Sequence, residues 1–206
     1  MLADLRFAGL DTFPQVVYGF AGRHSSLAEI QALCPNIIMS KQVHGTDIYD
    51  VTEPLNGLIV LDGFDGFTTQ QRGAALVVKI ADCAPILFYD PVTQVIAAAH
   101  AGRQGTEQGM AGKMVKHLAE RYSVRPADLL ACIGPAICVN CYQIDRETDQ
   151  HYDLWAENKK QLLSAGVRNV ELSGLCPACN AHDSFYSYRR DKTAQRNFAF
   201  LCLKPV

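Results

Sequence analysis

The sequence predicts an α+β fold, in which a sandwich of mixed β-sheets is flanked by helices. Short apolar segments of strand length dominate the first half of the chain, and longer helical patterns appear only afterwards. Strands and helices do not alternate strictly, as they would in a doubly wound parallel sheet. With 206 residues and no linker, low-complexity tract or repeat, we expect one domain covering residues 1–206.

The predicted strands of the first half are apolar runs bounded by glycine, proline or aspartate. They cover residues 16–20, 37–42, 58–61, 74–80, 86–89 and 95–99. A helix is predicted over residues 107–122, because its apolar side chains are spaced to line one face. Those side chains are Met110, Met114, Val115, Leu118 and Tyr122. The remaining predicted elements are a strand over 129–133, a helix over 149–165 and strands over 170–172 and 197–203.

Composition and charge exclude several classes of partner. A formal net charge of −2 gives no electrostatic reason to expect nucleic acid or an acidic membrane surface. Residues 1–6 carry an early acid and no sustained apolar run, so we expect no secretory signal, and no apolar run reaches membrane-span length. Eight cysteines are many for this length, but several lie in apolar strands. We therefore expect reduced thiols in the cytoplasm and no disulfide framework.

Three potential metal ligands, His44, Cys83 and His100, each end a short apolar run. Two imidazoles and a thiolate suit zinc or copper, and a catalytic zinc usually keeps three protein ligands and an open position for water. None of the three belongs to a local signature such as His-x-x-x-His. The prediction of a metal site therefore depends on the three residues converging at strand ends.

A second cysteine set consists of Cys138-x-x-Cys141 and Cys176-x-x-Cys179. Paired motifs of this kind are typical of structural zinc or iron–sulfur sites. Here 34 residues separate the pairs, a predicted helix fills the gap, and no knuckle glycines follow the cysteines. Neither pair clearly opens a helix that would lower a thiol pKa, which disfavours a redox role. We expect packed or reduced surface thiols, and a second metal site is the less favoured alternative.

Six segments carry a family resemblance. They are residues 41–45, 65–68, 81–91, 100–105, 134–142 and 187–191. In order and spacing they resemble the laccase-domain, or YfiH-like, family, whose members were described first as polyphenol oxidases and later as purine nucleoside phosphorylases with adenosine deaminase activity. The resemblance covers most of the chain from residue 36 onward. It implies an α/β/β/α sandwich like that of the cytotoxic necrotising factor catalytic domain, with His44, Cys83 and His100 as metal ligands.

The chain departs from the family pattern around the predicted substrate. Residues 100–105 read His-Ala-Gly-Arg-Gln-Gly where the family usually has His-Ala-Gly-Trp-Arg-Gly. The aromatic residue is therefore lost, and the arginine stands one position earlier, at Arg103. Arg23 is kept, but a following glycine pair is replaced by serines and the family's long loop is nearly absent. Gln143 stands where a glutamate is common. These changes alter the substrate shell and leave the metal ligands intact.

The resemblance implies a zinc-dependent purine nucleoside enzyme. Its reaction would be phosphorolysis of adenosine, inosine or methylthioadenosine, deamination of adenosine, or both. Zinc would lower the pKa of its water toward about 7 and so supply hydroxide at neutral pH. Cys83 would serve the reaction as a ligand, and Asp82 beside it would orient an imidazole or move a proton.

The expected phosphate and substrate ligands are Arg23, Arg103, Gln104 and Arg190. The turn over residues 102–105 leads into the predicted helix, whose free N–H groups favour an anion. Arginine side chains would add charge-assisted hydrogen bonds to the same phosphate. We expect the pair 189–190 on a strand, so that side-chain alternation lets at most one of the two arginines face the site.

Two other function classes stay open. A copper polyphenol oxidase needs several coppers and therefore many histidines. The chain has only six, and this count disfavours oxidase activity. A degenerate member that binds a nucleoside or a partner protein without turnover is favoured by the shortened loop and the altered turn. The expected partners are a purine nucleoside and phosphate, with no nucleic acid or membrane, and the chain would be a monomer or a homodimer.

Overall fold

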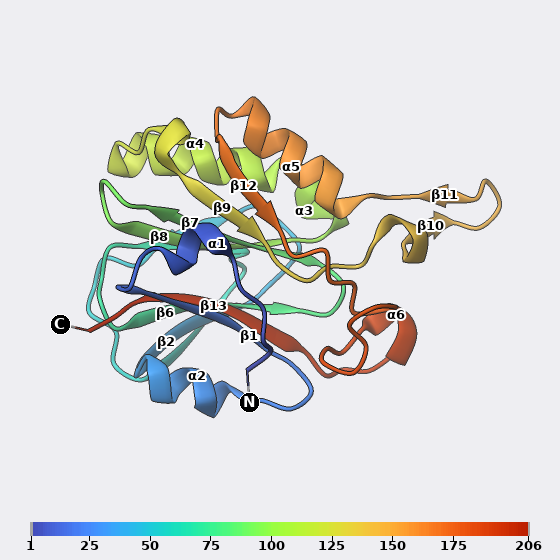
Figure 1. The fold of residues 1–206 in the computed structure, drawn as a ribbon, viewed down its shortest axis with the longest axis horizontal. Helices are drawn as coiled ribbons and strands as arrows, with labels where there is room; N and C mark the ends of the chain where they lie inside the picture. Colours follow the sequence, from blue (N-terminus) through green and yellow to red (C-terminus); the bar gives the residue numbers. More distant parts are fainter. Residues whose placement is uncertain (1, 206) are drawn as a thin grey trace.

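The computed structural model describes residues 2–205 as two mixed β-sheets packed face to face, with helices on both outer surfaces (Figure 1). The strands of the first sheet are, in spatial order, β1 (Val16–Ala21), β13 (Asn197–Leu203), β6 (Ala74–Ile80), β2 (Asn36–Lys41) and β4 (Leu58–Asp62). Those of the second sheet are β12 (Asn169–Leu172), β9 (Leu130–Ile133), β7 (Ala84–Asp90), β8 (Val95–Ala101), β5 (Gly66–Thr69) and β3 (Ile48–Asp50). A small hairpin of β10 (Gln143–Asp145) and β11 (Gln150–His151) projects from one end (Figure 1).

The helices are short. They are α1 (Ala8–Asp11), α2 (Leu27–Leu33), α3 (Arg103–Glu107), α4 (Met110–Tyr122), α5 (Leu154–Ser164) and α6 (Tyr188–Asp191), with 3₁₀ turns at Pro126–Asp128 and Val139–Cys141. Within residues 2–205, no helix has the length and hydrophobicity needed to cross a lipid bilayer.

Side-chain alternation along the strands produces three apolar layers. In β8, Val95 and Ala97 pack toward α4 and α5, whereas Ile96 and Ala98 pack against the opposite sheet. A third cluster lies between α2 and the outer face of the first sheet. The helix–sheet–sheet–helix order confirms the predicted α+β sandwich. His100 continues the series of Ile96 and Ala98, and this directs its side chain into the space between the sheets at the end of β8.

The nine strands predicted from apolar runs are all present, but two predicted helices are partly wrong. The helix over 107–122 is divided into α3 and α4 at Gly109, whose positive φ of 86° interrupts the helical path. The helix over 149–165 begins only at Leu154, where the Asp153 carboxylate caps the free N–H of Ala156. The residues before that cap instead pair with β10, because a turn at 145–150 closes a hairpin.

One cysteine pair differs from the expectation of reduced thiols. Cys34, at the end of α2, and Cys202, on β13, form a disulfide with a Cα–Cα distance of 6.7 Å. The two residues are 168 positions apart in the chain, so no local spacing announced the pair. They meet because α2 packs across the outer face of the sheet that contains β13.

A parallel crossover places two distant loops side by side. β12 lies parallel to β9, with Leu172 opposite Ile133, and α5 lies in the connection between them. Parallel strands that are neighbours end at the same edge of the sheet, and therefore the segments that follow them leave together. The backbone N–H of Ser173 donates to the carbonyl of Ile133 at 2.9 Å, and that of Ala136 donates to Leu175 at 3.1 Å.

Candidate active site

The three predicted metal ligands converge at one end of the sandwich. His44 follows β2, Cys83 lies between β6 and β7, and His100 lies near the end of β8. Their ligand atoms all lie within 4.8 Å of one another, and the two imidazole centroids are 4.9 Å apart. His100 is buried, Cys83 is half-buried and His44 is exposed. The set is therefore buried at His100 and open to solvent at His44, and a catalytic metal site requires such an open position.

The Asp65 carboxylate orders two of these ligands. Its Oδ1 lies 2.7 Å from Nδ1 of His100, which leaves Nε2 of that imidazole for a metal. It also accepts hydrogen bonds from the backbone N–H groups of Val43, His44 and Gly45, at 3.1, 3.1 and 2.9 Å. A carboxylate that fixes the orientation of a ligating histidine is a regular part of metal sites. From the sequence, Asp82 was the candidate for this orienting role, and Asp65 was only part of a segment of the family resemblance.

The charges within the cluster favour a thiolate. Burial raises the pKa of the Cys83 thiol, but the charge and hydrogen bonds of His100 and His44 outweigh burial and bring that pKa to about 6. Burial lowers the pKa of His100, but Cys83 and Asp65 raise it to about 9. For Asp65, burial opposes the effect of His100 and the backbone donors, and its pKa is lowered. The thiolate is the form of cysteine that binds metals.

Unusual backbone geometry brings the ligands close. His44 and Asp82 have positive φ angles of 62° and 86°, which non-glycine residues rarely adopt. Gly102 lies against the cluster, and a Cβ added there would lie 2.9 Å from Sγ of Cys83 and 3.0 Å from Cδ2 of His44. A glycine is therefore required for this close approach.

Asp82 lies beside the cluster with one oxygen free of protein partners. Its Oδ2 accepts the backbone N–H of Arg189 at 2.6 Å. Its Oδ1 is buried and has no hydrogen-bond partner among the described residues. Burial raises the pKa of this carboxyl. Asp82 is thus able to exchange a proton or accept a hydrogen bond at Oδ1.

A cavity of about 1030 Å³ lies against the three predicted metal ligands and Asp82. Seven basic side chains line it, and Asp82 is the only carboxylate among its lining residues. The basic residues are Lys41, Lys79, Arg103, Arg146, Arg189, Lys192 and Arg196. Tyr142 and Tyr188 add aromatic surface to the same wall. The cavity is large enough for a small organic ligand, and its charge favours an anionic group.

The predicted phosphate ligands divide into two groups. Arg103 and Gln104 line the cavity at the start of α3, whereas Arg23 and Arg190 are not among its lining residues. The latter two guanidiniums bind the carboxylate of Asp191 instead.

The expected strand at residues 189–190 is wrong, because these residues form α6 and the Ser187 hydroxyl caps its first turn. Arg189 is the member of the pair that lines the cavity, and its guanidinium donates to the carbonyls of Cys141 and Gln143. From the sequence, Arg189 and Arg190 were alternative candidates for the site and Arg190 was preferred, whereas Tyr142, in another segment of the family resemblance, was given no role.

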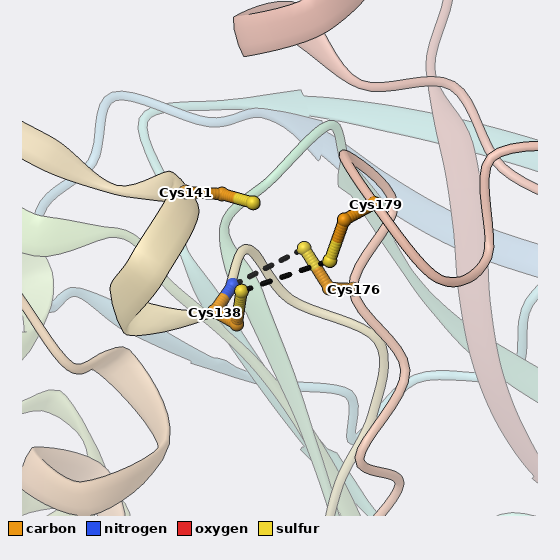
Figure 2. A group of neighbouring side chains, drawn as sticks. All are labelled: Cys138, Cys141, Cys176 and Cys179. Atoms are coloured by element: carbon orange, nitrogen blue, oxygen red, sulfur yellow. Dashed lines mark hydrogen bonds between the residues drawn. The ribbon is translucent and has the colours of Figure 1, made fainter.

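The two CxxC pairs also converge, although their spacing argued against it. The ligand atoms of Cys138, Cys141, Cys176 and Cys179 lie within 4.8 Å of one another (Figure 2). The long separation does not keep the pairs apart, because the parallel crossover returns the chain to the same edge of the sheet.

The fold is a sandwich of mixed sheets with a candidate metal site at one end, and comparison with known proteins identifies the family. A model described as multi-copper polyphenol oxidoreductase laccase matches residues 21–204. The chain therefore belongs to the laccase-domain, or YfiH-like, family, which confirms the resemblance seen in the sequence.

Similar proteins carry two kinds of name. Purine nucleoside phosphorylase YlmD of Geobacillus stearothermophilus is 35% identical over 195 residues, covering 80% of this chain and 71% of that protein. An adenosine deaminase from an unknown prokaryotic organism is 28% identical, covering 75% of this chain and 70% of its own length. The crystal structure of the Geobacillus protein superposes with a TM-score of 0.85 and 30% identity, covering 94% of this chain and 93% of that one. The YfiH protein of Bacillus licheniformis gives a TM-score of 0.83 at 28% identity, covering 93% and 94%.

Proposed function

We propose that this chain is a zinc-dependent enzyme that acts on purine nucleosides, by phosphorolysis, by deamination of adenosine, or by both. The observation that carries the proposal is the convergence of His44, Cys83 and His100 on one side of a large basic cavity. The names of the relatives supply the substrate class. A cavity of about 1030 Å³ is large enough for a nucleoside, and the basic side chains that line the cavity match the negative charge of phosphate.

The three ligands suit zinc by their chemistry. Two imidazoles and a thiolate are common zinc donors, and Asp65 leaves Nε2 of His100 for coordination. When bound, zinc would act as a Lewis acid and lower the pKa of a water in its open position toward about 7. Asp82, whose Oδ1 has no protein partner, would take up or deliver the proton that either reaction requires.

The α3 turn, residues 102–105 at the start of helix α3, determines how well phosphate is held. Phosphate needs a charged partner as it loses water, and a guanidinium supplies two parallel hydrogen bonds. Gln104 is neutral and exposed, and Arg103 is half-buried with its guanidinium 3.8 Å from Glu107. Deamination needs the metal, its water and a proton carrier but no phosphate. We therefore infer that the altered turn weakens phosphorolysis more than deamination.

The test is a set of incubations of adenosine and inosine with the purified protein, with and without phosphate, followed by chromatography. Metal analysis of the same preparation gives its zinc content. Inosine produced from adenosine, or base released only when phosphate is present, supports the proposal. Cys83→Ser replaces a thiolate by a poor ligand, and we expect it to lose both the metal of this site and turnover.

Two outcomes would replace the proposal. Oxidation of a phenol with several coppers per chain would favour the oxidase named by the family model, although the other histidines do not join the ligand set. A protein with metal at His44, Cys83 and His100 that binds a nucleoside without converting it would be a degenerate member. The neutral Gln104 in the α3 turn is the observation that favours this second outcome.

A further inference from the structure

A second set of potential metal ligands lies outside the site described above. Cys138 precedes a 3₁₀ turn after β9 and Cys141 is the last residue of that turn, whereas Cys176 and Cys179 lie in the loop after β12. Their four sulfur atoms lie within 4.8 Å of one another and point toward a common centre (Figure 2). The ligands of the first site belong to other segments, so the two sets share no residue.

The spacing of the sulfur atoms matches a single tetrahedral ion. Zn–S bonds of about 2.3 Å place the corners of a tetrahedron about 3.8 Å apart. Sγ of Cys138 lies 3.8 Å from Sγ of Cys179, far beyond the length of a disulfide bond. A four-iron cluster is excluded by the same compactness, because each of its cysteines binds a different iron and the cluster itself separates them.

We propose that Cys138, Cys141, Cys176 and Cys179 bind one zinc ion in a closed tetrathiolate site. A tetrahedral set of four sulfurs selects zinc or iron, and divalent zinc binds more tightly than divalent iron. With four protein ligands no position is left for water, so this zinc is structural. Each thiol gives up its proton on binding, and the filled site carries two net negative charges.

Neighbouring groups are arranged to support such a site. The backbone N–H of Cys138 donates to Sγ of Cys176 at 3.3 Å, which orients one ligand and stabilises negative charge on it. Two guanidiniums bind carbonyls of the same loops. That of Arg189 donates to Cys141 at 3.3 Å, and that of Arg190 donates to Pro177 at 2.6 Å. Because Arg190 is also paired with Asp191, the positive charge of Arg189 is the one that partly offsets the charge of a tetrathiolate site.

The site would fix one wall of the cavity. Tyr142 and Gln143 follow the first cysteine pair directly and line the cavity. The carbonyl of Gln143 holds the Arg189 guanidinium at 2.8 Å, and the backbone N–H of Arg189 binds Asp82. A metal that joins the loops after β9 and β12 therefore keeps the positions of groups that face the substrate.

Metal analysis of defined variants tests the proposal without using activity. The wild-type protein should contain about two zinc ions per chain if the first site is also filled, and Cys83→Ser should retain about one. In the Cys83→Ser background, Cys179→Ser should lose that remaining ion, whereas Cys179→His, which keeps a zinc ligand, should retain it. Cys132→Ala, a change at a buried cysteine outside both sets, is the matched control and should keep the metal content of its parent.

A spectroscopic measurement supports the assignment of ligands. Cobalt exchanged into the Cys83→Ser protein should show the intense visible bands of tetrahedral thiolate coordination, and these should be absent after Cys179→Ser. A Cys83→Ser protein that folds but contains no metal would overturn the proposal. So would unchanged metal content after Cys179→Ser, or iron in place of zinc. Because the readout is metal in a protein without the first site, the result is independent of whether the chain converts nucleosides.

Discussion

Gly102 offers a way to disturb the first metal site without removing a ligand. Its φ of −75° and ψ of 177° are open to any residue, so Gly102→Ala brings no backbone strain. The added Cβ would lie 2.9 Å from Sγ of Cys83 and 3.0 Å from Cδ2 of His44. Because unstrained contacts begin near about 3.5 Å, both contacts have to lengthen by roughly half an ångström, which displaces the two ligands relative to residue 102. Metal sites tolerate displacements of about 0.2 Å, so we expect weaker metal binding.

The magnitude follows from the cost of overpacking. Inserting a methyl group into a filled space costs about 1–3 kcal/mol, and about 1.4 kcal/mol corresponds to a tenfold change in affinity. If metal binding has to restore the original ligand positions, zinc at the first site should bind about 10- to 100-fold more weakly in Gly102→Ala. Competition with a chromophoric chelator measures this affinity. The same titration of Cys83→Ser gives the signal from zinc bound elsewhere in the protein, which is subtracted.

Gly112→Ala is the matched control. Gly112 lies in α4, its φ is negative, and a Cβ added there meets nothing within 4 Å. This variant should leave zinc affinity unchanged and raise the free energy of unfolding by about 0.5–1 kcal/mol, because alanine loses less backbone entropy in a helix. The expected rise in Tm is about 2–4 °C per kcal/mol for a chain of this length. Zinc affinity of Gly102→Ala within about twofold of wild type would refute the steric reasoning.

Three further predictions concern single carboxylate or amide groups. Asp65→Asn should weaken zinc binding at the first site by about 10- to 100-fold in the same chelator assay, since it removes the charge that orients His100, and unchanged affinity would contradict this. Gln104→Arg should raise phosphorolysis more than deamination in the nucleoside incubations, and an equal change in both would show that the turn does not select between them. Asp50→Asn should reduce the free energy of unfolding by about 2 kcal/mol at pH 7, because Asp50 accepts a hydrogen bond from Nε2 of His117 at 2.7 Å. Burial opposes the hydrogen bonds to Asp50, and its pKa is nevertheless lowered on folding. Its contribution is therefore present above about pH 4 and is lost as the pH falls below that, so Asp50→Asn should show a flatter acid limb in urea unfolding, and parallel curves would refute the assignment.

Much of the fold was predictable because its strands are apolar and bounded by turn-forming residues. The predicted strands over 74–80 and 197–203 coincide with β6 and β13, and the ends of the other strands predicted from apolar runs differ by a few residues. Short strands without an apolar run, such as β3 and β5, were not predicted. β5 contains Gly66 and two threonines, and its burial comes from neighbouring strands rather than from its own hydrophobicity.

The proposed metal ligands could be found from the sequence, whereas the residues that hold neighbouring side chains in place could not. His44, Cys83 and His100 end apolar runs, so strand prediction alone brings them to element ends. Asp65 precedes a strand that was not predicted, and its contact with His100 depends on the pairing of β5 with β8. Asp191 forms an ion pair with Arg23, 168 positions earlier in the chain, and no local spacing predicts this pair.

The convergence of the two cysteine pairs was predictable from the sequence, although a second metal site was the less favoured alternative there. The predicted strands over 129–133 and 170–172, with a predicted helix between them, form the pattern of a parallel crossover unit. Such a unit brings the residues after each strand to one edge. The separation of 34 residues is therefore the length of a crossover, and it does not argue against a shared zinc site.

The two proposed zinc sites should lose their metal in a fixed order. The first has one thiolate, two imidazoles and an open position beside a cavity, and its His44 is exposed. The second has four sulfur ligands and no open position. A chelator attacks most readily through an open position, and soft thiolates hold zinc more tightly than imidazoles do.

Stepwise dialysis against a chelator at neutral pH should therefore remove about one zinc per chain first, with loss of nucleoside turnover and no change in near-UV circular dichroism. Removal of the second ion should alter the near-UV spectrum and speed hydrogen exchange in the segments after β9 and β12, because the two loops would no longer be joined. Returned zinc should restore both signals, and a Cys83→Ser sample should show only the second step. If the near-UV change came with the first ion in the wild type, the first site would be the one that holds these loops, and the assignment of a separate structural site to the four cysteines would be wrong.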